Sequence, residues 1–432
     1  MKIVLGKESV VCRGMTFEEN AWGAYQFPRP HKDGNRILCS VHVEDDNLIE
    51  TGNPEKWFES YDNGKTWKEV SPSVAASSGF TMPNGDKLYF PVDAGINLKD
   101  YKFPGRSVIT PGYDFSARAK EGEMPAPDGV CAWWVGNVFQ AYNEKRLPPS
   151  LAGSFWHVQR IKKGTNSVID EKIPVDWPYL TRVVMKTSDG GLMKPIFPKG
   201  NLKTGPDGAV WISGFSGEGH INPENGWYSP YYSAEIFRSD DNGHSFKRWS
   251  HMEYPADGVN YPYLSGGFSD SDFAFFDDGS MSWFFRSAWF GSTGWEWAPM
   301  YQSRSFDMGK TWTKPEKFAF TGIFPRLCRL NCGATLITYA RPGVFVQACR
   351  NSDGQGWTEP LEVMTPGDRH LLANSVVQTP TFHQWDGADN NTELLEISDD
   401  TALLFYSDFY YPDKNGLKRK TILCRPVTVI KD

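Results

Sequence analysis

The sequence predicts an all-β fold, a six-bladed β-propeller that forms a single domain over residues 1–432. Two observations predict it: six turn signals flanked by short apolar strands, and a Ser-x-Asp-x-Gly turn motif that recurs after most of them. Recurring units of this kind indicate a repeat architecture. Aromatic residues at 15%, with 41 Gly and 30 Pro, also suit many short strands joined by tight turns.

Each predicted hairpin has a turn signal followed by an aliphatic or aromatic run, which is the strand–turn–strand signature. The six turns are Asp33-Gly34, Asn84-Gly85, Asp207-Gly208, Asp278-Gly279, Asn331-Cys332-Gly333 and Ser398-Asp399-Asp400. We expect each hairpin to supply the inner two strands of a four-stranded blade. The N-terminus is expected to complete the last blade, with residues 3–5 or 10–11 beside 421–423, because such closure removes open sheet edges.

The spacing of the turns is about even except between Asn84 and Asp207. We interpret residues 91–150 as an insertion in blade two that forms a lid or rim, since its aromatic content is too high for a disordered linker. A seventh blade hidden in this interval is the alternative.

The Ser-x-Asp-x-Gly motif is clearest at residues 60–67 and 305–312, close at 239–246, and degraded at 187–191 and 351–357. Its Asp carboxylate can accept hydrogen bonds from nearby backbone N–H groups, and its Gly takes a positive φ. The Trp or Phe that follows packs between neighbouring sheets. In a blade, these turns lie on the face opposite the start of the inner strand, so we interpret their carboxylates as structural.

Composition excludes several function classes. The net charge of -7 shows no basic surface for nucleic acid. No run of eighteen apolar residues could span a membrane. The apolar run at the N-terminus ends after three residues, unlike a signal peptide. The seven cysteines lack paired spacing, so we expect buried thiols in the cytoplasm, unless a leader precedes this sequence. We expect no cofactor and no catalytic metal.

The start of the first strand and the end of the second strand of each blade lie on one face, around the central axis. This mouth is where chemistry is expected. The candidate catalytic residues are Asp270, Glu218, His220, His42 and Glu44. The candidate substrate-binding residues are Gln26, Arg286, Arg341, Arg326, Asp272, Trp22, Tyr25 and Asp408.

These residue types suit an anionic sugar, because guanidinium groups bind carboxylates through two hydrogen bonds. Two carboxyl groups that flank a glycosidic bond can act as acid and as nucleophile or base, and an imidazole can also serve as acid or base. Structural roles are the alternative for each residue. One residue of register slip would turn Arg326 away from the axis, and His42 is equally compatible with a structural histidine.

The turn motif, the hairpin repeats and the strand-end arginines resemble the sialidase (BNR, or Asp-box, repeat) superfamily over nearly the whole chain. The resemblance implies a six-bladed propeller whose members hold a sugar carboxylate with three arginines and use an Asp acid with a Tyr–Glu nucleophile pair. Arg286 and Arg341 match two of the arginines. The chain departs from the family at the first arginine position, which carries Gln26, and in its last inner strand, residues 373–377, which has no Tyr.

We therefore expect a carbohydrate-active enzyme, an exo-acting glycoside hydrolase of changed specificity whose partner is an oligosaccharide or polysaccharide with an acidic or modified sugar. A polysaccharide lyase that uses His42 or His220 as base is one alternative. A non-catalytic glycan-binding propeller is another, since binding needs only stacking and a few hydrogen bonds. A protein-interaction scaffold is the third.

Overall fold

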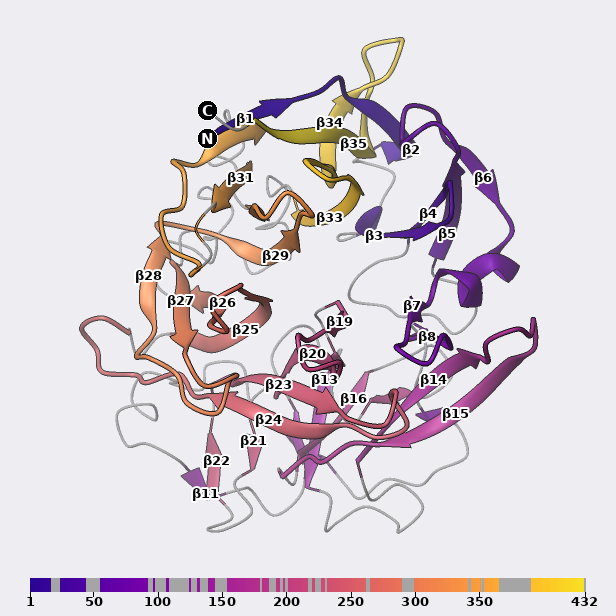
Figure 1. Ribbon diagram of the computed structural model, residues 1–432. Helices are drawn as coiled ribbons and strands as arrows, with labels where there is room; N and C mark the ends of the chain where they lie inside the picture. Colours follow the sequence, from indigo (N-terminus) through magenta and orange to yellow (C-terminus); the bar gives the residue numbers. More distant parts are fainter. Residues whose placement is uncertain are drawn as a thin grey trace.

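All six predicted turns join the two inner strands of a blade in the computed structural model, which is a six-bladed β-propeller (Figure 1). The structure describes residues 1–16, 24–43, 55–91, 154–178, 201–216, 231–261, 265–289, 299–340, 343–349, 351, 353–364 and 390–430, with the backbone of short strands between residues 96 and 229.

The blades follow one another along the chain. Blade one is β3 (Gln26–Asp33), β4 (Arg36–His42), β5 (Glu55–Ser60) and β6 (Lys68–Val70). Blade two is β7 (Phe80–Thr81), β8 (Lys87–Tyr89), β14 (Phe155–Ile161) and β15 (Val168–Pro174). Blade three is β18 (Phe197–Pro198) and β19 (Lys203–Thr204), then β20 (Val210–Phe215), β23 (Ala234–Ser239) and β24 (Lys247–Met252).

Blade four is β25 (Ser265–Phe275), β26 (Met281–Trp289), β27 (Met300–Ser305) and β28 (Glu316–Ala319). Blade five is β29 (Ile323–Arg329), β30 (Thr335–Ala340), β31 (Val344–Cys349) and β32 (Leu361–Met364). Blade six is β33 (Asn390–Ser398), β34 (Thr401–Pro412) and β35 (Lys418–Ile430), joined by β1 (Lys2–Leu5) and β2 (Ser9–Thr16).

The N-terminal strands pair with the last strand of the chain. Ile3 of β1 lies opposite Val429, and Val10 of β2 lies opposite Leu423, both in antiparallel register with β35. The two chain ends therefore lie side by side in blade six (Figure 1). This pairing joins the two ends of the ring, and it covers an edge of β35 that would otherwise be open.

The long interval between the second and third turns contains an insertion inside blade two, between β8 and β14, and further strands between β15 and β18, rather than a seventh blade. Strand β14 pairs with β8 across it, with Gln159 opposite Tyr89. Strands from this interval, and two strands that lie between β20 and β23 of blade three, form two further sheets. One contains β9 (Ile96–Asn97), β10 (Arg106–Val108), β12 (Val130–Ala132), β13 (Phe139–Asn143), β16 (Thr181–Met185) and β17 (Leu192–Lys194); the other contains β11 (Met124–Pro125), β21 (His220–Ile221) and β22 (Trp227–Ser229).

The degraded motif at residues 187–191 was assigned to a blade from sequence, and this is wrong. The strands on either side of it, β16 and β17, pair with each other in the inserted sheet. The corresponding turn of blade two joins β14 to β15 at residues 162–167, which contain Gly164 at φ 78° but no Asp. The place of these strands in the fold depended on distant strand partners, which a local motif does not encode.

The turns at Asp62, Asp241 and Asp307 share one geometry. In each, the Asp Oδ1 accepts from the backbone N–H groups three and four residues ahead, and Oδ2 accepts from the Thr or Ser hydroxyl four residues ahead. The Thr66 hydroxyl and N–H groups hold the pKa of Asp62 at about 2. These carboxylates are fully occupied within their own turns, which is a structural role.

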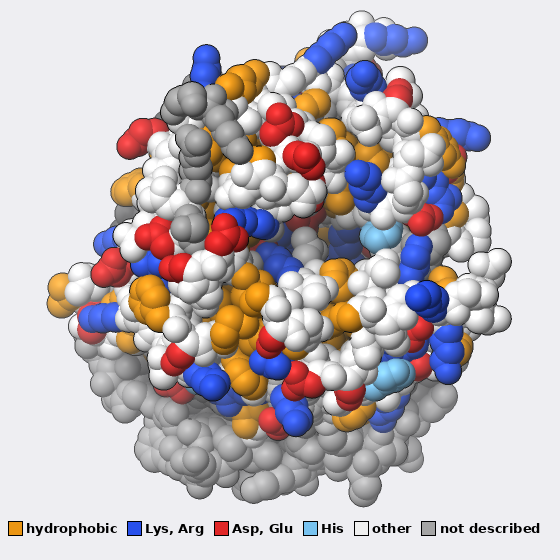
Figure 2. Space-filling view, viewed as in Figure 1, with side chains coloured by type: hydrophobic (Ala, Val, Ile, Leu, Met, Phe, Trp, Pro, Cys, Tyr) orange, Lys and Arg blue, Asp and Glu red, His pale blue; other side chains and the backbone are white. Residues whose placement is uncertain are grey.

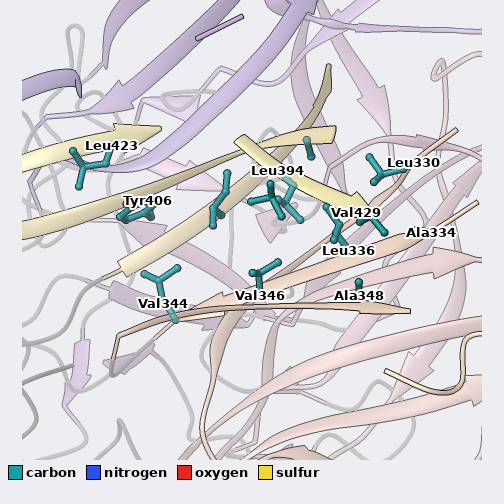
Figure 3. Packing of buried hydrophobic residues seen from close by; sticks show 14 residues of the cluster. Leu330, Ala334, Leu336, Val344, Val346, Ala348, Leu394, Tyr406, Leu423 and Val429 are labelled. Carbon is teal, nitrogen blue, oxygen red and sulfur yellow. The ribbon is translucent and has the colours of Figure 1, made fainter. Parts of the chain in front are cut away.

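Apolar side chains fill the space between adjacent blades. Between blades five and six, Val344, Val346 and Ala348 of β31 lie below Leu394 and Leu423 (Figure 3). Alternate residues of a strand share one face, so every second position of β31 faces this cluster. Burying such side chains stabilises the fold by about 1.5–3 kcal/mol each. In the described residues the helix is a short 3₁₀ segment, η1 (Pro72–Ser78), and no helix is long and apolar enough to cross a membrane.

Candidate functional site at the propeller mouth

Four inner strands carry a β-bulge near the mouth, each with a non-glycine residue at positive φ. The residues are Phe27 (53°), Asp270 (31°), Phe324 (52°) and Asn391 (44°), from blades one, four, five and six. Such a conformation costs of order 1–3 kcal/mol per residue and is concentrated at functional sites. A bulge also re-aims the side chains beside it. Four of the eight non-glycine residues at positive φ in the described part of the chain therefore lie at these bulges, where the sequence predicts the chemistry, whereas Asn63, Asn242 and Met308 lie in the Asp turns.

A charged residue lies two positions after each of these bulged residues. They are Arg29, Asp272, Arg326 and Glu393, and blades one and five even share the tripeptide Phe-Pro-Arg at residues 27–29 and 324–326. Because each residue follows the same bulge at the same distance along its inner strand, the four residues occupy equivalent places in their blades. Together they form a ring of charged residues around the axis, two positions further along the inner strands than the bulged residues; we call this ring the charged level.

Two ion pairs occupy most of this level. Arg326 Nε donates to Glu393 Oε2 at 2.9 Å, and Lys203 Nζ lies 2.8 Å from Asp272 Oδ1. Asn201 Nδ2 also donates to Glu393 Oε1 at 2.9 Å. Asn201 lies between β18 and β19 of blade three, whereas Glu393 belongs to blade six, on the opposite side of the ring (Figure 1). The Asn201–Glu393 contact crosses the axis, and the three contacts together form a floor beneath the mouth, which we call the axial network.

The predicted substrate-binding roles of Asp272 and Arg326 are not supported by this arrangement. Asp272 is fully buried and also accepts from the N–H groups of Phe273 and Leu327. Arg326 is 3% exposed, and its guanidinium stacks 3.8 Å from the centre of the Phe324 ring. Burial raises the pKa of Glu393, although Arg326 opposes the shift. Both predicted residues belong to the axial network, because the bulges shift the strand register that sequence reasoning assumed.

Above the floor, predicted mouth residues from blade one meet residues of blades five and six. Gln26 pairs with His42 across β3 and β4, and its Oε1 accepts from Asn391 Nδ2 at 2.9 Å. The Phe27 ring lies 6.1 Å from His42 and 5.7 Å from Phe324. Blades one and five are not neighbours, so the two phenyl rings meet near the axis.

Asp270 and Arg286 form the charged pair of the mouth in blade four. Arg286 Nη1 donates to Asp270 Oδ2 at 2.6 Å. The side chains are 9% and 16% exposed. Arg286 Nε is buried and has no hydrogen-bond partner in the part of the chain that the structure describes. The guanidinium therefore keeps hydrogen-bond capacity beyond its contact with Asp270.

Tyr25, a candidate substrate-binding residue, lies in the core between two blades. The residue is 7% exposed and belongs to the core cluster between blades six and one, with Val11, Ile37 and Phe405. Its ring lies against Gly14 so closely that a Cβ there would be 2.5 Å away. Burial is the main cause of the raised pKa of the Tyr25 hydroxyl.

For the remaining predicted residues, the structure gives a contact, a backbone position or no description. Asp408 is buried in β34 and accepts from the N–H of Tyr410 at 2.7 Å. The backbone of His220 lies in β21, which pairs with β22 in a sheet separate from blade three. Trp22, Glu44, Glu218 and Arg341 lie outside the described residues.

Sequence reasoning missed Arg29, which the structure places at the charged level of blade one. Its side chain is 50% exposed and lies 3.8 Å from Glu55 Oε1. Glu55 in turn accepts from the hydroxyls of Ser40 and Tyr89. The repeated Phe-Pro-Arg tripeptide was the signal that could have identified it. Figure 2 shows a hollow at the centre of the ring with Lys and Arg side chains inside it.

The class of the protein is thus a six-bladed β-propeller with a strained, polar mouth. No family model matches the chain, and neither does any curated protein sequence. Among solved structures, the chain is similar to a protein of unknown function from Dyadobacter fermentans, with a TM-score of 0.57 and 16% identity over 99% of both chains. A likeness at this identity shows the fold alone.

Two further solved structures are more distant. One is an alpha-L-arabinanase from Penicillium chrysogenum complexed with arabinobiose, with a TM-score of 0.47 and 10% identity over 98% of both chains. The other is a sialidase from Streptococcus pneumoniae, with a TM-score of 0.45 and 12% identity over 98% of this chain and 70% of that one. At these scores neither likeness bears on the activity of this protein.

Proposed function

We propose that this propeller is a glycoside hydrolase that cleaves an acidic or modified sugar from a glycan at its mouth. The observation that carries the proposal is the Asp270–Arg286 pair. A carboxylate and a guanidinium lie 2.6 Å apart, and the carboxylate is at a strained position of an inner strand. Strain of this size persists only where the surrounding fold holds it in place.

The two side chains suit different parts of the reaction. An arginine contact stabilises the ionised form of a carboxylate, so Asp270 is assigned the role of nucleophile or base. The guanidinium of Arg286, whose side chain is 16% exposed, is assigned to the acidic group of the sugar. Gln26 and His42 supply hydrogen-bonding groups, and Phe27 and Phe324 supply ring faces. The acid partner is assigned among Glu218, Glu44 and His220.

The test is hydrolysis of aryl glycosides of uronic, sialic and deoxy sugars by the wild type and by Asp270→Asn. We expect the variant to lose about 10²–10⁴-fold in kcat/KM, the range for removing a positioned base. Asp241→Asn is the matched control, because Asp241 sits in a turn on the opposite face of the ring and should leave kcat/KM unchanged.

Three outcomes would overturn the proposal. Turnover that Asp270→Asn leaves intact would remove Asp270 from the chemistry. Glycan binding without turnover on any substrate would identify a glycan-binding propeller. Products that carry a new carbon–carbon double bond and absorb in the ultraviolet would identify a lyase.

A further inference from the structure

A groove of about 650 Å³ lies on the outer side of the ring, between blades three and four. Its walls are residues 248–252 of β24, residues 310–315 after the Asp307 turn, and Asp176 with Pro178. None of the mouth residues described above lines it. Its volume falls within the usual range for small-ligand sites, about 300–1,000 Å³.

The walls of this groove are held by hydrogen bonds and ring packing. Trp249 Nε1 donates to the carbonyl of Met308, and Ser250 Oγ donates to that of Gly309, both at 2.6 Å. Trp312 Nε1 donates to Gly309 at 3.1 Å, and its ring lies 5.0 Å from Trp283. The blade-four turn is therefore fixed onto blade three, so the groove needs little rearrangement to accept a ligand.

The charge of the groove is opposite to that of the chain. Arg248, His251, Lys310 and Lys314 line it with a single acidic residue, Asp176, on a chain whose net charge is -7.

Two of these cations are already satisfied. Arg248 Nε and His251 Nδ1 each lie 2.8 Å from the buried carboxylate of Glu235.

The other two cations are available for a ligand. Lys310 and Lys314 make no ion pair in the described part of the chain, and the Lys314 ammonium lies 5.3 Å from the Tyr261 ring. The two ammonium groups can bind carboxylates. The Trp249 and Trp312 rings beside them can pack against sugar faces.

We propose that this groove is a second binding site, for a carboxylate-bearing carbohydrate chain. The site rests on the proposed function: it holds a distant part of the polymer whose end enters the mouth. Binding at a second point on the same chain raises the effective concentration of that end at the mouth. The proposal therefore concerns polymers and does not extend to small substrates.

The experiment measures binding of polygalacturonate, and of uncharged dextran, by titration calorimetry. In Lys310→Gln/Lys314→Gln we expect Kd for polygalacturonate to rise at least tenfold, with kcat/KM on a small aryl glycoside unchanged. Added salt should weaken the wild-type binding, since the contacts are exposed charges. The matched control is Lys65→Gln, because Lys65 occupies the place of Lys310 in the equivalent turn of blade one.

The inference is overturned if the wild type does not bind polygalacturonate, or if it binds dextran equally well. It is also overturned if the double variant binds as the wild type does, or if Lys65→Gln loses as much affinity. The experiment also distinguishes failure of this inference from failure of the proposed hydrolase function. Lysine-dependent binding in a protein that hydrolyses nothing would support the groove and contradict the hydrolase.

Discussion

Arg326 and Glu393 form an ion pair of 2.9 Å between blades five and six, with side chains only 4% and 6% exposed. Glu393 also accepts from Asn201 and from the N–H of Leu394, so both carboxylate oxygens are used. The desolvation of a buried pair roughly cancels its Coulomb attraction. We infer that the pair mainly fixes how three blades meet at the axis.

Removing one member of this pair should be far more costly than removing both. Arg326→Met leaves Glu393 buried without its partner, and we expect a loss of about 3–5 kcal/mol in the free energy of unfolding. Arg326→Met/Glu393→Leu should recover most of that loss. Urea-induced unfolding measures both. Lys56→Met is the control, since the Lys56–Glu69 pair is 43% and 57% exposed and should contribute less than about 1 kcal/mol. Equal losses in Arg326→Met and Lys56→Met would contradict the prediction.

Alanine substitutions at Gly267 and Gly279 should distinguish the cost of a steric clash from the cost of a positive φ. Gly267 has φ of 90°, and a Cβ there would lie 2.4 Å from the carbonyl oxygen of Tyr232, which bridges blade three to blade four. Gly279 has φ of 83°, with nothing within 4 Å of a Cβ. We expect Gly279→Ala to cost about 1–2 kcal/mol from φ alone, and Gly267→Ala to cost clearly more. Thermal unfolding compares the two, and equal melting temperatures would refute the difference.

The stability contributed by His251 should depend on pH. Burial lowers the pKa of His251, but the Glu235 carboxylate outweighs this and raises it above 6.5. Burial raises the pKa of Glu235, but the contacts of this carboxylate with His251 and Arg248 outweigh burial and lower the pKa below 4.5. The histidine contribution is fully present below pH 6.5 and is lost as the pH rises through the raised value. The glutamate contribution is present above pH 4.5 and is lost on further acidification.

His251→Gln should therefore lower the melting temperature most between about pH 4.5 and 6.5, and progressively less toward pH 9. His244→Gln is the control, because the His244 side chain is 53% exposed and lies 4.0 Å from its nearest carboxylate. A constant difference between wild type and His251→Gln across this range would show that the ring acts by packing alone.

Arg29 should contribute to ligand binding without contributing much to folding. Its side chain is half exposed and lies near Glu55 at a distance too long for a hydrogen bond. If the mouth binds an acidic sugar, Arg29→Ala should weaken binding of that sugar about 10–100-fold, the range for a charged hydrogen bond. Arg29→Lys should restore part of it. The melting temperature should change little; an unchanged Kd for the sugar would exclude Arg29 from the site.

Much of the ring could be predicted from the sequence because its signals are local. Turn residues such as Asp33-Gly34 and Asp278-Gly279 favour a hairpin through the conformations of one or two residues, and all six turns were placed correctly. The motif at residues 187–191 shows the limit of such signals. The same local pattern occurs there, but the strands on either side of it, β16 and β17, pair in the inserted sheet and not in a blade.

The site was predicted only in part. Gln26, His42, Asp270 and Arg286 lie where the strand ends indicated. Asp272 and Arg326 belong to the axial network, and Tyr25 belongs to the core between blades six and one.

The sequence by itself determined the turns between the inner strands of the six blades and the face on which the structural carboxylates lie, because each depends on a few adjacent residues. Only the tertiary structure decided which charged residues line the mouth and which close its floor. A bulge shifts the alternation of every side chain beyond it, and the partner of Glu393 or Asp272 comes from another blade. No local pattern encodes either outcome.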